Sequence, residues 1–170
     1  MFNLFGAALV VLLMIPNIVY AMKRRGETNL CKNRFMNVLE QIVRYGSMLF
    51  MVFYGEENSM RLSSAQVRLC YGLGSLFLLA AYWTVWGVYF RKMGVHIKNR
   101  EPSAVFAAGG KEVSRVVSLK WALALLPAGC FALCGAALAH IPLIVSAAVF
   151  TVGHSYVTYS NIVNEILHGP

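Results

Sequence analysis

The sequence contains no aspartate, and only 13% of its residues are charged, about half of the roughly 25% usual in soluble proteins. It also lacks zinc-protease, nucleophile-elbow and dinucleotide-binding motifs. Its four cysteines and four histidines do not follow the spacing of a metal site. No reaction is indicated by any of these patterns, so an enzyme is the less favoured class, and we expect neither a metal nor a cofactor.

The chain consists largely of long hydrophobic runs. Of its 170 residues 58% are hydrophobic, and the mean hydropathy is +0.61. One small core cannot bury so many apolar side chains, so lipid is the expected solvent. We predict an all-α, polytopic transmembrane bundle of about five helices that forms a single domain over 1–170. The predicted spans are about 2–22, 36–54, 67–90, 118–137 and 141–163, with a cytoplasmic loop at about 91–117.

Basic residues gather in two of the segments between the apolar runs. Twelve of them follow the first and third runs: Lys23, Arg24, Arg25, Lys32, Arg34, Arg91, Lys92, Lys98, Arg100, Lys111, Arg115 and Lys120. Only Arg61 and Arg68 follow the second run. The positive-inside rule then predicts an N-terminus outside and a C-terminus in the cytoplasm. We interpret the first run as a retained helix, because its basic residues follow the apolar stretch, whereas those of a signal peptide precede it.

This distribution also explains the net charge of +8 without nucleic acid, which we do not expect as a partner. Basic residues beside a membrane attract anionic lipid headgroups. Lipid is therefore an expected partner, and the predicted location is a bacterial cytoplasmic membrane.

Polar residues inside two predicted spans recur at helical spacing. In the second span Glu40 precedes Arg44 by four residues, the favourable order for an ion pair on one helix face. In the fifth span His154 and Asn161 share a stripe, and Asn17 lies near the inner end of the first span. At 1.5 Å per residue Arg44 lies roughly 12 Å deep, and His154 roughly 20 Å from the outer face.

The aromatic residues Tyr82, Trp83, Trp86 and Tyr89 occupy the same inner half of the bilayer in the third span. Ionisable groups inside a membrane often mark a site, so we predict a cavity that opens to the cytoplasm. The candidate ligand-binding residues are Asn17, Glu40, Arg44, Trp83, Trp86, His154 and Asn161.

Structural explanations remain open for the same residues. Glu40 and Arg44 are able to pair with each other and extend to the headgroups. Trp86 fits an ordinary interfacial aromatic belt. His154 fits a plain hydrogen bond to a neighbouring helix as well as a titrating group.

Three stretches carry a resemblance: Ile15-Pro16-Asn17-Ile18, the run from Leu39 to Gly46, and Gly153-His154-Ser155. Together they resemble a group of small multi-pass bacterial membrane proteins that has no known activity. The number of helices is also similar to the translocator-protein group of small-ligand binders, although the Trp and Pro pattern of that group is missing here.

Three functions remain as hypotheses. The first is small-molecule binding or transport through the cytoplasm-facing cavity, with Glu40 and Arg44 orienting the ligand. The second is a non-catalytic partner subunit of a larger membrane complex, whose small-residue helix faces and basic loops dock another membrane protein or anionic lipid. A second copy of the chain remains an open partner. The third is a membrane enzyme with Glu40 and His154 as acid and base.

Overall fold

The computed structural model describes residues 2–23, 29, 31–53, 64–98 and 110–168, without the side chains at 92–98, 110–113 and 165–168. These residues form five helices: α1 (Leu4–Lys23), α2 (Arg34–Val52), α4 (Ala65–Lys98), α6 (Gly110–Leu138) and α7 (Ile141–His168). Within the described ranges the β-structure is limited to an isolated bridge between Phe2 and Phe53. The predicted all-α helical bundle is confirmed.

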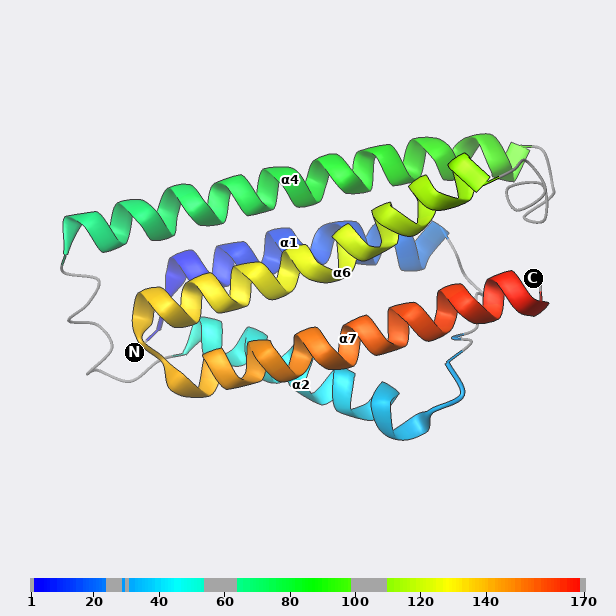
Figure 1. Ribbon diagram of the computed structural model, residues 1–170. Helices are drawn as coiled ribbons and strands as arrows, with labels where there is room; N and C mark the ends of the chain where they lie inside the picture. Colours follow the sequence, from blue (N-terminus) through cyan, green and yellow to red (C-terminus); the bar gives the residue numbers. More distant parts are fainter. Residues whose placement is uncertain (1, 24–28, 30, 54–63, 99–109, 169–170) are drawn as a thin grey trace.

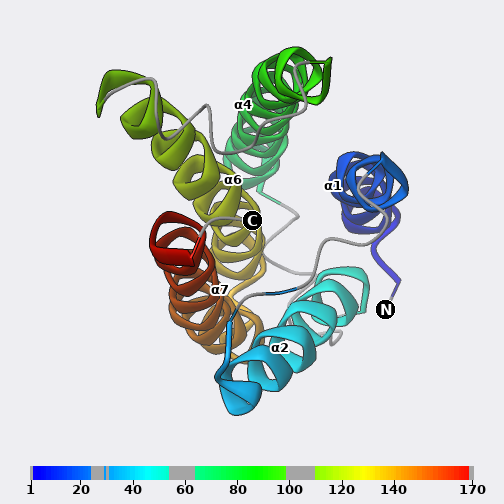
Figure 2. The same ribbon diagram turned by 90° about the vertical axis from the view of Figure 1, so that its right-hand side faces the viewer.

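The helices run up and down along one long axis, so each is antiparallel to the next in the chain (Figure 1). Viewed along the axis, the order around the bundle is α1, α4, α6, α7 and α2 (Figure 2). The most extensive contacts join α6 to α7, α4 to α6 and α2 to α7, whereas α1 contacts α2 and α4 over smaller areas. The α1 helix is therefore the least embedded of the five.

Four of these helices, α1, α4, α6 and α7, are long and apolar enough to cross a membrane, as expected for an integral membrane protein. The fifth, α2, has 19 residues but does not reach that hydropathy, because Asn37, Glu40, Gln41 and Arg44 all lie within it. A fifth span therefore stays a prediction. The α4 and α6 helices extend well into the predicted loop at 91–117, of which residues 99–109 lie outside the described part of the chain.

A tight hairpin joins α6 to α7. The His140 N–H donates to the Gly135 carbonyl at 2.9 Å, and the Ala139 N–H donates to the Ala136 carbonyl at 3.2 Å. This is the Schellman pattern of a helix C-terminus, and Ala139 accordingly has a φ of 51°. The hairpin backbones approach closely, since a Cβ on Gly135 would lie 3.1 Å from the Ile144 backbone nitrogen.

The apolar core is richest between α6 and its neighbours. The rings of Phe131 and Phe150 meet edge to face with centroids 5.5 Å apart, and both side chains are buried. Small residues recur at four-residue spacing along α6, and the buried ones lie in its middle. Ala124 and Ala128 are buried, whereas Ala132 and Ala136 are exposed.

The start of α1 is fixed to the end of α2. The Asn3 N–H donates to the Val52 carbonyl at 2.7 Å, and the Asn3 side chain donates to the Met51 carbonyl at 3.1 Å. Gly6 lies against that carbonyl, where a Cβ would be only 2.3 Å from the Met51 oxygen. The named contacts between α1 and α2 all lie at this end of the bundle.

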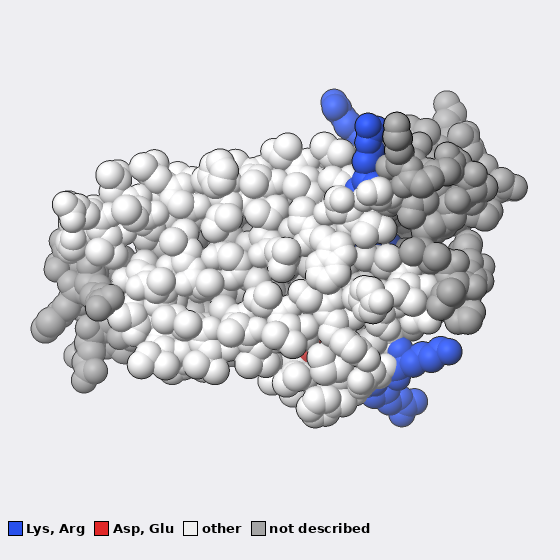
Figure 3. Space-filling model, in the orientation of Figure 1, with Lys and Arg blue, Asp and Glu red and all other residues white. Residues whose placement is uncertain are grey.

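Most of the described basic side chains gather at the opposite end. Figure 3 shows Lys and Arg at that end of one face and none along the middle of the same face. Six basic residues with described side chains lie toward that end: Lys23, Lys32, Arg34, Arg91, Arg115 and Lys120. Arg68, in contrast, lies near the start of α4 at the other end. Large apolar side chains such as Phe77 and Val152 are exposed along the sides of the bundle, as lipid contact requires.

Candidate functional site

The α2 helix begins at Arg34 because a set of asparagines satisfies its first turn. Asn33 is the N-cap, and its side chain accepts the Met36 N–H at 3.2 Å. The Asn37 side chain donates to the Cys31 carbonyl and accepts from the Asn29 amide, both at 2.9 Å. These contacts fix the register of α2 and therefore the positions of Glu40 and Arg44 one to two turns later.

Two contacts define how α2 lies against α7. The hydroxyls of Ser47 and Ser146 are hydrogen-bonded at 2.6 Å. A Cβ on Gly153 would lie 3.6 Å from the Glu40 backbone, which is ordinary van der Waals contact. The helices are antiparallel, so the side chain that follows Gly153 on α7 reaches the carboxylate of Glu40.

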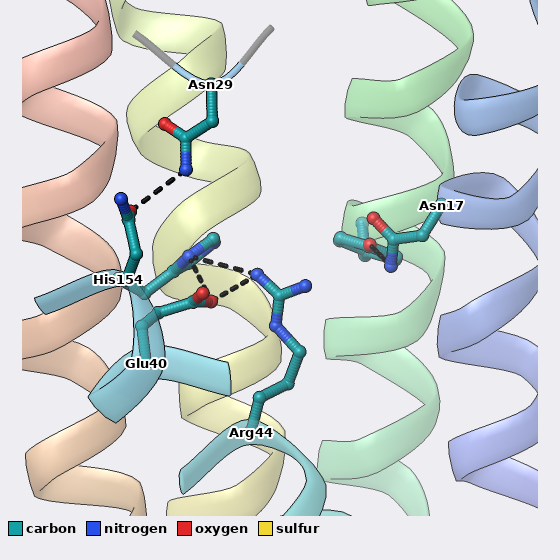
Figure 4. A network of polar contacts seen from close by, with 7 residues as sticks. Asn17, Asn29, Glu40, Arg44 and His154 are labelled. Atoms are coloured by element: carbon teal, nitrogen blue, oxygen red, sulfur yellow. Dashed lines mark hydrogen bonds and ion pairs between the residues drawn. The ribbon is translucent and has the colours of Figure 1, made fainter. Parts of the chain in front are cut away.

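Glu40, Arg44 and His154 meet at this point (Figure 4). Glu40 is only 5% exposed. Its Oε1 accepts a hydrogen bond and ion pair from Arg44 Nη2, and it lies 3.0 Å from His154 Nδ1. Arg44 Nη2 is also 3.5 Å from His154 Nδ1. The structure thus brings together three of the sequence-predicted site residues, from two helices, on one carboxylate oxygen.

An aromatic ring supports two of these side chains. The imidazole of His154 stacks on Phe150 with centroids 5.0 Å apart and an interplanar angle of 12°. The Arg44 guanidinium carbon lies 6.0 Å from the centroid of the same ring, within cation–π range. Sequence reasoning missed Phe150, although its spacing of four residues from His154 was the available signal.

The carboxylate of Glu40 is compensated within the cluster. Ionised Glu40 and Arg44 cancel, so the pair is neutral as a whole. A buried carboxylate needs such partners, and the imidazole of His154 lies beside the same oxygen.

Asn17 lies on the other side of the bundle, near α4. Its amide donates to the Tyr82 hydroxyl at 2.9 Å and to the Leu13 carbonyl at 3.0 Å. The guanidinium of Arg44 projects toward this side of the bundle (Figure 4). The structure pairs Asn17 with Tyr82, which the sequence analysis placed in the inner half of the bilayer but not among the candidate residues.

Trp86 lies among aromatic side chains beside Tyr82. Its ring stacks on Phe90 with centroids 5.0 Å apart and contacts Tyr20, Tyr82 and Tyr89. Trp86 is 6% exposed, yet its indole nitrogen has no hydrogen-bond partner among the described residues. A buried donor without a partner is costly.

Trp83 lies apart from the cluster, against α1. It is 43% exposed, and its indole N–H donates to the Leu12 carbonyl of α1 at 3.2 Å. That carbonyl is the one that a residue at position 16 would normally bond, but Pro16 has no N–H. Trp83 therefore satisfies the carbonyl that Pro16 leaves free, and its donor is not available to a ligand.

Asn161 is also separate from the cluster. It lies seven residues beyond His154, about 10 Å farther along α7. The antiparallel pairing of Ser146 with Ser47 and of Gly153 with Glu40 places Asn161 opposite the start of α2. Its side-chain oxygen is buried without a hydrogen-bond partner in the described part of the chain.

No protein-family model, curated protein or solved structure that we compared with this chain is similar to it.

Proposed function

We propose that this integral membrane protein binds a small polar molecule inside its helical bundle, at Glu40, Arg44 and His154, and carries it to or from the cytoplasmic side. The observation that supports the proposal is a carboxylate, nearly inaccessible to solvent, that is paired with a guanidinium from its own helix and lies beside an imidazole from α7. Arg44 lies ten residues into α2, about 15 Å along the helix and near the middle of a core about 30 Å thick.

The accessibility of Arg44 separates a binding role from a purely structural one. The side chain of Glu40 is 6% exposed, whereas that of Arg44 is 33% exposed. A purely structural ion pair at this depth is expected to enclose both partners, because an ionised group that faces lipid is costly. Here one partner is enclosed and the other remains accessible, which is the arrangement expected of an anchored group that meets a ligand.

The direction of access follows from the basic end of the bundle. The positive-inside rule favours that end in the cytoplasm, which leaves the N-terminus outside and the C-terminus inside. The route to Arg44 then begins at the cytoplasmic face. The proposed location is the cytoplasmic membrane of a bacterium, and the proposed lipid contacts are anionic headgroups at the basic helix ends.

The test is native mass spectrometry of protein extracted under mild conditions, followed by thermal unfolding of the purified protein with the molecule that is found. We expect a small bound mass that raises the unfolding temperature of the wild type and not that of Arg44→Gln. Arg34→Gln is the matched control, since it makes the same change on the same helix at an exposed position outside the cluster.

A stoichiometric bound protein with no small mass would instead identify a partner subunit. Equal stabilisation of the wild type and Arg44→Gln would disprove the location of the site.

A further inference from the structure

The α2 helix carries two stripes of side chains, one buried and one exposed, each at intervals of three or four residues. The buried stripe consists of Glu40, Ser47 and Met51, with Arg44 between the first two. The exposed stripe is apolar, and its members are 55–71% exposed: Phe35, Val38, Ile42, Tyr45 and Leu49. This order is the reverse of that of a helix on the surface of a soluble protein, where the polar face meets water.

The mean hydropathy of α2 conceals this arrangement, because an average counts the two stripes alike. The polar groups that lower the average do not face outward as a set. Glu40 is buried, and its charge is balanced by Arg44. Among the exposed residues from Phe35 to Phe50, Gln41 alone is an amide or a charged side chain. The outer side of α2 is therefore as apolar as that of a membrane span, and its ionised groups face the bundle, as ionised groups in membranes usually do.

Contacts in both halves of α2 fix its depth against two helices that are apolar enough to cross a membrane. Near the end of α2, the Val52 carbonyl accepts the N–H of Asn3, which directly precedes α1. Nearer its start, Glu40 lies against Gly153, which belongs to the apolar part of α7, Ile141–Asn164. The 19 residues of α2 extend roughly 28 Å, close to a hydrocarbon core of about 30 Å. If α1 and α7 cross the membrane, α2 lies at the same depth.

The exposed stripe also continues the apolar surface of its neighbours. Around the bundle α2 lies between α1 and α7 (Figure 2). The α1 helix exposes Val11 and Ile18, and α7 exposes Val145 and Val152. These side chains belong to helices whose exposed sides meet lipid in an integral membrane protein. The same lipid therefore extends over the outer side of the helix between them.

We propose that the exposed stripe of α2 contacts the acyl chains of bilayer lipid, so that α2 is a fifth membrane-spanning helix whose charged pair is kept from lipid by α7. Five spans place the two termini on opposite sides of the membrane. This inference goes beyond the proposed function, because lipid contact at the outer stripe requires no ligand at Glu40.

The test is electron paramagnetic resonance of the full chain in lipid nanodiscs, with a nitroxide attached to one introduced cysteine. The variants are Val38→Cys, Ile42→Cys, Tyr45→Cys and Leu49→Cys, in a Cys70→Ala background, since the three other cysteines are buried. Oxygen concentrates in hydrocarbon and a nickel chelate in water, so the ratio of their collision rates measures depth. We expect oxygen to dominate at all four positions, most strongly at 42 and 45 in the middle of the helix.

Two further positions calibrate this measurement. Val152→Cys, on the exposed side of α7 and next to Gly153, is the lipid reference, and Lys32→Cys, exposed before the start of α2, is the water reference. Collision rates at 42 and 45 that match those at 32 would place α2 in water and overturn the proposal. Low rates with both reagents would overturn it too, because a second copy or another protein would then cover the stripe.

A second measurement uses the unsubstituted chain. A phosphatidylcholine with a photoreactive diazirine in its acyl chain labels side chains that face lipid. We expect adducts on α2 as well as on α7, and adducts on α7 without any on α2 would contradict the proposal. The proposed function is tested apart from this, since the effect of a ligand on the unfolding of the wild type and Arg44→Gln does not depend on what covers the outer stripe.

Discussion

The two faces of α7 are built on different principles. Toward α6 the helix presents apolar groups, with Phe150 against Phe131 and the hairpin backbones in close contact at Gly135. Toward α2 it presents Ser146 and His154, which bond to Ser47 and Glu40. One helix is thus held by dense packing on one side and by polar contacts on the other.

This difference matters because lipid removes the hydrophobic gain that drives association in water. Apolar helices associate in a membrane only as far as they pack better against each other than against lipid. Polar contacts between membrane helices contribute about 0.6 kcal/mol on average, although each is specific in position. We infer that the α6–α7 face provides most of the stability, and the α2–α7 face provides a site.

The largest effect is expected from Phe131→Ala on the packed face. Phe131 is completely buried, so truncation leaves a cavity and removes many dispersion contacts, at a cost of about 2–3 kcal/mol. The free energy of unfolding in mixed micelles measures this. Leu125→Ala, at a position of α6 that is 46% exposed, is the control and should cost far less. Equal costs would show that α6 does not pack as described.

A smaller loss is expected from Glu40→Leu on the polar face. The change leaves Arg44 and His154 without their shared acceptor, which costs about 1–2 kcal/mol because the Arg44 side chain is 33% exposed and is not left fully enclosed. Gln41→Leu, on the exposed side of the same turn, is the control. A loss as large as that of Phe131→Ala, measured in the same micelles, would mean that the two faces contribute equally.

The bond between Trp83 and α1 extends the comparison to a third interface. Trp83→Phe should cost about 1 kcal/mol in the wild type, because the Leu12 carbonyl loses its donor. In a Pro16→Ala background the cost should nearly vanish, since the introduced alanine supplies the missing N–H. A double-mutant cycle measures the coupling, and additive costs would contradict it.

The smallest effect is expected from the two serines. Ser47→Ala and Ser146→Ala should each cost about 0.6 kcal/mol, and the double variant little more than either alone. A double-mutant cycle on the two serines measures their coupling energy. A coupling energy larger than the loss of unfolding free energy in Glu40→Leu would mean that the serine pair, and not the charged cluster, is the main attachment of α2.

Much of the fold was predictable from hydropathy alone, since lipid requires long apolar helices and satisfied backbone groups. Each of the five described helices overlaps one of the apolar runs read from the sequence. Their ends were less predictable, because α4 and α6 continue as helices into a polar segment that hydropathy excluded. The site was predictable in part: the spacing of Glu40 and Arg44 placed them on one face.

The sequence by itself therefore determined the apolar runs, the uneven distribution of basic residues and the depth of each polar group, because these properties depend only on order along the chain. The tertiary structure decided which helices adjoin. It brought His154 to Glu40, joined Asn17 to Tyr82, and assigned Trp83 to Leu12 and Trp86 to an unsatisfied interior position. The depth of a residue follows from its position along one helix. A contact between two residues depends on how both helices are rotated and which helices adjoin, and side-chain packing decides both.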